Sequence, residues 1–195
     1  DADVIVMGVP SQSLRKVLEE AKPYIRPWVP VINLAKGLEL NTKKRMTEII
    51  EEILPENPAG VLTGPNLAKE IHFGKAAAAV IAMVDHNIAS RLQTVFSSGL
   101  FRVYTNDDVI GCELGGALKN IIAIASGICH GLRYGDNFQA VLVSAAIREI
   151  ERFIDAVHEV HRDVKSSAYL GDLLVWVYGL HTVPVVEALR EVNLK

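Results

Sequence analysis

The chain lacks several features that would assign it to a specialised class of protein. Its 195 residues carry a formal net charge of only -3 at pH 7, so it has no basic field that would draw it to nucleic acid. It has two cysteines, Cys112 and Cys129, which lie in an apolar stretch without metal-ligand spacing. This pattern predicts reduced thiols in the core, with no disulfide and no metal held by cysteine.

Long apolar runs are also lacking. The longest strictly apolar run, residues 76–84, is far shorter than the roughly 18 residues that cross a bilayer. Near the start, two acidic residues flank a short apolar run at 4–7, where a signal peptide would have basic residues before a longer apolar run. We therefore expect a cytoplasmic protein without a membrane partner. Because the chain does not start with Met, we also expect the sequence to begin inside a longer protein.

The first half of the chain alternates between β-branched runs and helical periodicity. Strands are predicted over residues 4–9, 29–34, 59–62, 76–84 and 101–104, with helices between them. This alternation favours a parallel α/β sheet. The turns Pro10-Ser11, Lys36-Gly37 and Gly64-Pro65-Asn66 each follow a strand, and ligands of such sheets bind at the carboxyl ends of the strands. We therefore expect these turns to form part of a binding site.

The pattern changes after Thr105. Residues 109–128 read as one long apolar helix with a single lysine, Lys119, and helical periodicity continues over 138–160. We therefore predict a boundary near Thr105, which divides the chain into an α/β domain over residues 1–104 and a mostly helical domain over residues 105–195.

Lys119 is the most informative single residue. A helix that is apolar all round is usually buried, so its lysine must reach the surface, find a partner or lose its charge. Desolvation lowers the pKa of a lysine in general and suits it to proton transfer near neutral pH. The neighbouring Gly115 and Gly116 each cost the helix roughly 1 kcal/mol relative to alanine, which is tolerated where another group approaches closely. From the residues alone, a lysine that reaches the surface at a helix edge stays an alternative.

Three further features could bind a small anionic ligand. Lys36, at the end of a predicted strand, could meet a phosphate or a carbonyl oxygen, or could simply be a solvated loop lysine. The Gly64-Pro65-Asn66 turn opens a helix whose free N–H groups suit an anion, although a plain turn has the same pattern. Asp172 lies among apolar residues, which indicates a cationic partner or a capping role. The six histidines have no metal-ligand pattern, so we predict no metal site.

Several motifs in chain order carry a resemblance that none carries alone. They are Val-Pro-Ser at 9–11, Ala-Lys-Gly-Leu-Glu at 35–39, and the longer stretches 62–70, 101–111, 113–127, 135–137 and 170–173. Together they make the chain resemble the NAD(P)-dependent glycerol-3-phosphate dehydrogenase family. The resemblance implies a Rossmann-like parallel sheet, incomplete at its N-terminus, followed by a mostly α-helical domain. Residues 1–104 would be a partial dinucleotide-binding domain, and residues 105–195 the substrate and catalytic domain.

The same resemblance implies an oxidoreductase that interconverts dihydroxyacetone phosphate and sn-glycerol 3-phosphate with NAD or NADP, for the supply of glycerophospholipid precursors. The catalytic residues implied are Lys119, as proton donor and acceptor, and Asp172. The implied substrate contacts are Lys36, Gly64, Asn66, Lys119, Asn120 and Asp172, and the implied cofactor contacts are Pro10, Lys36 and Ala68. We expect a small-molecule substrate and a homodimer that forms through the helical half.

The chain departs from the family pattern in four places, one of which is the poor fit of residues 153–167. It has no G-x-G-x-x-G turn to hold a pyrophosphate, no Arg-Asn pair after Asp172, and Ser144-Ala145-Ala146 where the family has a Thr-Arg-Gly-like stretch. Either segments of a longer protein are missing from the sequence or the chain is a shortened variant. We favour the former, because a sheet cut through its centre exposes strand edges. The alternatives are a non-catalytic remnant that binds a phosphorylated ligand or dimerises, and a dehydrogenase for another hydroxy acid.

Overall fold

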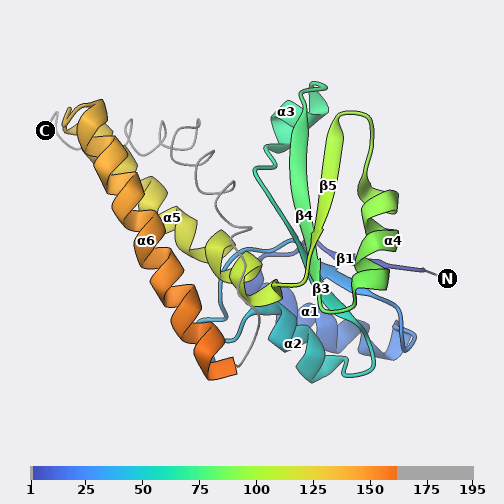
Figure 1. The fold of residues 1–195 in the computed structure, drawn as a ribbon. Coiled ribbons are helices and arrows are strands. Elements are labelled where there is room, and N and C mark those ends of the chain that lie inside the picture. Colours follow the sequence, from blue (N-terminus) through green and yellow to red (C-terminus); the bar gives the residue numbers. More distant parts are fainter. Residues whose placement is uncertain (1, 162–195) are drawn as a thin grey trace, which may run out of the picture.

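The computed structural model describes residues 2–161, which form an α/β body and a long helical hairpin (Figure 1). In chain order the elements are β1 (Ile5–Met7), η1 (Ser11–Ser13), α1 (Leu14–Ala21), η2 (Lys22–Tyr24), β2 (Val31–Asn33), α2 (Met46–Ile53), β3 (Ala59–Thr63), α3 (Ala68–His72), β4 (Ala77–Met83), α4 (His86–Phe96), β5 (Phe101–Asn106), α5 (Val109–Gly131) and α6 (Asp136–His161). The predicted class, a Rossmann-like sheet followed by helices, is confirmed. The division into two domains stays a prediction.

The five strands form one sheet in the order β1-β2-β3-β4-β5. β1, β2 and β3 are parallel, as predicted, and β4 and β5 are parallel to each other. The β3–β4 pair is antiparallel, with Thr63 opposite Val80, which differs from an all-parallel sheet. The connection, residues 64–76, holds only the five-residue helix α3; a parallel neighbour usually needs a full crossover helix, whereas an antiparallel one does not.

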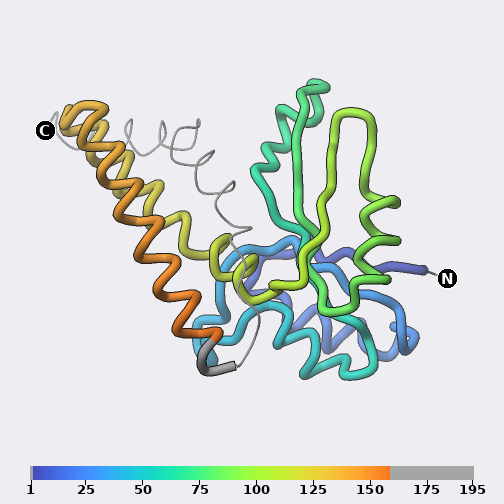
Figure 2. Tube along the Cα trace, in the orientation of Figure 1, coloured from blue at the N-terminus to red at the C-terminus, as the bar shows by residue number. Residues whose placement is uncertain are grey.

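Two apolar clusters hold helices against this sheet. α1 and α2 bury side chains at helical spacing, among them Leu14, Leu18 and Ile49, against Met7 and Val31. α4 packs on β2, β4 and β5 in a second cluster: Ile32, Ala79, Ile81, Met83, Ala89, Leu92 and Val103. The chain trace shows β4, β5 and α3 extending away from the base that α1 and α2 form (Figure 2).

Helix α5 leaves the end of β5 and pairs with α6 in an antiparallel hairpin (Figures 1 and 2). Its first half is buried against the sheet and α2, whereas Ile121, Ile124 and Ile128 in its second half are exposed. Within residues 2–161, α5 alone has the length and apolar composition of a membrane span, but 61% of that window is buried inside the protein. The core helix of a folded domain has the same character, and the absence of a membrane partner stays a prediction.

Candidate functional site

The candidate site begins at the edge where the parallel strands β1, β2 and β3 end. Pro10 follows β1, Lys36 follows β2 and Gly64 follows β3, and the carboxyl ends of parallel strands meet at one edge of a sheet. The ammonium group of Lys36 donates a hydrogen bond of 3.2 Å to the carbonyl oxygen of Gly64. The predicted convergence of the second and third turns is therefore observed as a direct contact.

Gly64 is needed because the turn passes close to β4. A Cβ atom at this position would lie 2.6 Å from the carbonyl oxygen of Ala78 and 2.8 Å from the Cα atom of Ala79. The backbone N–H of Asn66 donates to the Gly64 carbonyl oxygen at 2.8 Å. The side-chain Oδ1 of Asn66 is buried, and no hydrogen-bond partner for it lies in the described part of the chain. The turn therefore holds a buried acceptor close to Lys36.

Helix α5 crosses this edge through a glycine. A Cβ atom on Gly116 would lie 3.4 Å from Oγ1 of Thr63 and 3.8 Å from Cγ and Cδ of Lys36. Gly116 thus has the neighbours that we expected beside the glycines of this helix, at distances that a Cβ atom would meet in ordinary contact. Lys119 follows one helical turn later, and only 1% of it is exposed. Of the two alternatives that the residues left open, the structure therefore shows the buried lysine and not one that reaches the surface at a helix edge.

The other predicted site residues lie around this cluster or beyond the described residues. Pro10 is exposed at the start of η1, Ala68 is exposed at the first position of α3, and Asn120 is exposed on α5 next to Lys119. Asp172 lies outside the described residues. The structure therefore joins Lys36, Gly64 and Asn66 by contact, and Lys119 lies on α5 one helical turn beyond Gly116, the residue beside Lys36. The roles of all these residues stay predictions.

Sequence reasoning missed one buried charge on α5. Glu113 accepts hydrogen bonds from the backbone N–H of Thr47 at 2.9 Å, from the Thr47 hydroxyl and from Nη1 of Arg45 at 2.9 Å. Burial raises the pKa of Glu113, and the charge of Arg45 and the hydrogen bonds from Thr47 and Arg45 oppose that shift. The available signal was a second charged residue in the same apolar stretch, two helical turns before Lys119.

A second missed pair joins Asp108, which caps α5, to His158 on α6. The two side chains lie 2.9 Å apart and are both buried. Within residues 2–161 no group of three or more histidine, cysteine, aspartate or glutamate side chains could hold a metal ion.

Two family profiles match the chain. The first, described as the NAD-dependent glycerol-3-phosphate dehydrogenase N-terminus, matches residues 1–89, and the second, the C-terminus of the same family, matches residues 108–183. Glycerol-3-phosphate dehydrogenase (NAD(P)+) 2 of Sphingopyxis alaskensis is 57% identical over 173 residues, which cover 89% of this chain and 52% of that protein. The corresponding protein 1 of Mycobacterium tuberculosis is 51% identical over 174 residues, or 89% and 51% of the two chains. The chain thus spans about half the length of the curated relatives it matches.

Solved structures agree with these matches. The glycerol-3-phosphate dehydrogenase of Coxiella burnetii superposes with a TM-score of 0.79 at 29% identity, over 96% of this chain and 62% of that one. The enzyme of Saccharomyces cerevisiae gives a TM-score of 0.82 at 28% identity, over 97% of this chain and 57% of that one. The sequence and the fold therefore point to the same relatives.

Proposed function

The chain belongs to the NAD-dependent glycerol-3-phosphate dehydrogenase family, and on that premise we propose that it interconverts dihydroxyacetone phosphate and sn-glycerol 3-phosphate with NAD or NADP. The observation that carries this proposal is the burial of Lys119 on α5, one turn beyond the glycine that lies against Lys36 and Thr63. A buried lysine at the carboxyl edge of a parallel sheet suits acid–base chemistry on a small ligand bound there.

The proposed role of Lys119 follows from the proton balance of the reaction. When the carbonyl carbon is reduced, its oxygen needs a proton, which the ammonium group of Lys119 donates; in reverse the amine accepts it. The nicotinamide cofactor supplies or takes the hydride when it is bound. The ammonium group of Lys36 is held by the Gly64 carbonyl oxygen. This cation could bind the phosphate of the substrate or its carbonyl oxygen. The buried Oδ1 of Asn66 is an acceptor suited to a substrate hydroxyl.

The residues present fit one end of the dinucleotide only. Pro10, Lys36 and Ala68 lie at or beside the edge where the nicotinamide would bind, and they are the proposed cofactor contacts. The sequence contains no G-x-G-x-x-G turn, so these 195 residues provide no family-type cradle for the pyrophosphate.

The remaining assignments rest on the family alone. They comprise a substrate contact by Asn120, a catalytic and substrate role for Asp172, a homodimer through the helical half, a cytoplasmic location and the supply of glycerophospholipid precursors. We keep them as parts of the same proposal.

The proposal is tested by oxidation of NADH or NADPH in the presence of dihydroxyacetone phosphate, using the full chain. We expect substrate-dependent oxidation, and a loss of roughly 100- to 10,000-fold in Lys119→Met, as for other lost general acids. The matched control is Lys16→Met, because the Lys16 side chain is 81% exposed on α1. If the folded chain binds dihydroxyacetone phosphate without turning it over with either cofactor, the proposal is wrong and the non-catalytic binding protein takes its place.

A further inference from the structure

Glu113 is the buried polar link between α5 and α2. The Glu113 side chain is 5% exposed and that of Arg45 is 12% exposed. Three donors from one short segment meet its carboxylate: the backbone N–H of Thr47, the Thr47 hydroxyl and Nη1 of Arg45. Nη1 of Arg45 also donates to Oγ1 of Thr47 at 3.1 Å. With so many donors, the carboxylate has one well-defined position relative to the start of α2, because charge-assisted hydrogen bonds are strong and directional.

The spacing along α5 connects this link to the candidate site. Glu113, Gly116 and Lys119 are each three residues apart, so they lie on successive turns of one helix. The first of these turns is fixed to α2, the second lies against Thr63 and Lys36, and the third carries the buried lysine. The placement of Lys119 therefore depends on how α5 is anchored one and two turns earlier.

The crossing at Gly116 cannot set that placement by itself. A glycine offers no side chain to interdigitate with the neighbouring strands, so rotation and sliding of α5 are restrained by side chains earlier in the helix. Val109 and Cys112 pack with Val61 on β3 and Ala82 on β4. Glu113 adds directional hydrogen bonds to this packing, since a rotation or a shift of one residue would carry its carboxylate away from Thr47.

We propose that Glu113 is a positioning residue, which sets the rotation and register of α5 and so places Lys119 against the turn of Lys36 and Gly64. The inference deepens the proposed function and rests on it, because Lys119 matters only if it handles the proton. Glu113 acts through the helix and does not touch the substrate. A misplacement of about 1 Å in a catalytic group can cost on the order of 100-fold in rate.

The experiment observes Lys119 directly, so that it does not depend on turnover. The full chain is labelled with ¹³C at the ε-carbon of lysine, the Lys119 resonance is assigned by its loss in Lys119→Met, and its shift is followed against pH. We expect Glu113→Ala to move the resonance and its titration midpoint, and Glu113→Gln to restore them in part, because an amide oxygen still accepts from Thr47. Glu149→Ala is the control, since the Glu149 side chain is 79% exposed on α6.

The same variants are then assayed for turnover. We expect kcat to fall by about 10- to 100-fold in Glu113→Ala, with a smaller change in the KM for dihydroxyacetone phosphate. If Glu113→Ala does not fold, Arg45→Met removes one donor from the other side of the link and takes its place. An unchanged Lys119 titration in the folded variants would overturn the inference and leave Glu113 a purely stabilising role. Absence of turnover in the unaltered chain would overturn the proposed function, while the Lys119 resonance would still decide the role of Glu113.

Discussion

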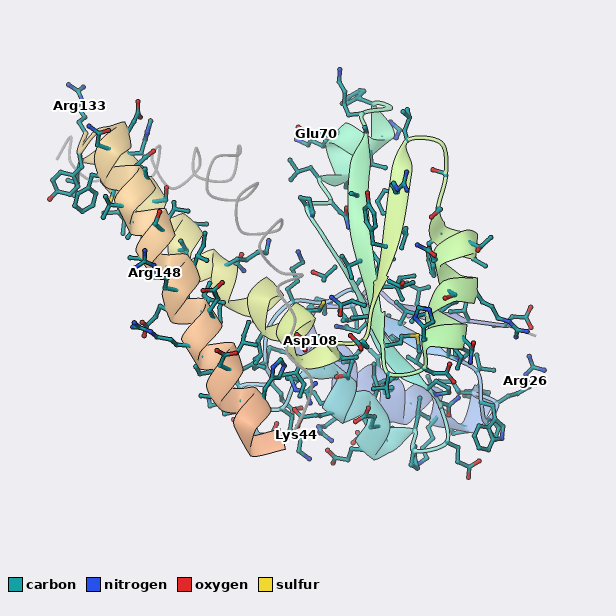
Figure 3. All side chains as sticks on the ribbon, in the orientation of Figure 1. Arg26, Lys44, Glu70, Asp108, Arg133 and Arg148 are labelled. Atoms are coloured by element: carbon teal, nitrogen blue, oxygen red, sulfur yellow. The ribbon has the colours of Figure 1, made fainter. Side chains whose placement is uncertain are left out.

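The ring of His158 donates a hydrogen bond of 2.9 Å to Oδ1 of Asp108, although the two residues lie 50 positions apart in the sequence. The same oxygen accepts the backbone N–H of Gly111 at 2.7 Å, so it also caps the first turn of α5. Asp108 lies where the sheet passes into α5 (Figure 3), and His158 belongs to the last turns of α6. One carboxylate oxygen thus joins both helices of the hairpin at the end next to the sheet.

This arrangement predicts a large loss of stability when His158 is removed. In His158→Ala the Asp108 carboxylate would stay buried without the hydrogen bond from His158, and leaving a buried acceptor without a partner in this way costs about 1–3 kcal/mol of unfolding free energy. Urea unfolding followed by circular dichroism measures the change. Asp107→Ala is the matched control, because Asp107 is exposed beside the pair, and we expect a change within about 0.5 kcal/mol there. Equal effects of the two substitutions would contradict the prediction.

A surface cluster predicts a pH-dependent contribution to stability. Arg15 binds Glu39 at 2.8 Å and Glu52 at 3.0 Å. Hydrogen bonds from its guanidinium group are the main cause that lowers the pKa of each carboxyl group from 4.5 to about 2. A lowered pKa in the folded state stabilises the protein above the ordinary value, and the gain is lost as the pH falls towards the lowered value.

Arg15→Met should therefore lower the melting temperature at neutral pH, and the difference from the unaltered chain should fade between pH 4.5 and about 2. Thermal unfolding at a series of pH values tests this, and added salt should shrink the difference because the Glu52 carboxylate is exposed to solvent and that of Glu39 is only partly buried. Lys16→Met serves as the control, since Lys16 makes only a 4.0 Å pair with Glu20. A difference that stays constant down to the lowest pH would show that Arg15 acts through packing instead.

Patterns over a few neighbouring residues in the sequence predicted the strands, the turns that follow them and the long apolar helix. β-branched runs followed by turns placed Lys36 and Gly64 at one edge, and their contact is observed. The apolar helix around Lys119 indicated either a buried lysine or one that reaches the surface, and the structure shows the buried one. The direction of β4 was not predictable in this way, because periodicity identifies a strand but not its orientation. The pairs of Glu113 with Thr47 and of Asp108 with His158 join residues 66 and 50 positions apart. Such contacts depend on how the helices pack, which single-residue patterns do not encode.

Replacing Gly64 by alanine tests whether the turn after β3 must pass close to β4. In Gly64→Ala the new methyl group would meet backbone atoms of Ala78 and Ala79 at 2.6 and 2.8 Å, so the turn must move and the Lys36 contact with it. We expect a loss of about 1–3 kcal/mol, typical of overpacking, as measured by chemical unfolding. Gly99→Ala is the control, because a Cβ atom there meets nothing within 4 Å. Equal stability of the two variants would mean that the turn adapts without strain.

Replacing Gly116 by alanine should have opposite effects on the stability of the fold and on turnover at the candidate site. A methyl group at this position would lie 3.4 Å from Thr63 and 3.8 Å from Lys36, which is ordinary contact, and alanine favours a helix over glycine by about 1 kcal/mol. Gly116→Ala should therefore unfold at a higher urea concentration than the unaltered chain, whereas Gly116→Leu should unfold earlier because it overpacks the crossing. The methyl group also fills space beside Lys36, so we expect turnover of dihydroxyacetone phosphate to fall in Gly116→Ala even though the protein is more stable. If stability and turnover both rise in Gly116→Ala, a side chain at this position hinders neither the packing of α5 on the sheet nor the binding of the ligand, and the prediction is wrong.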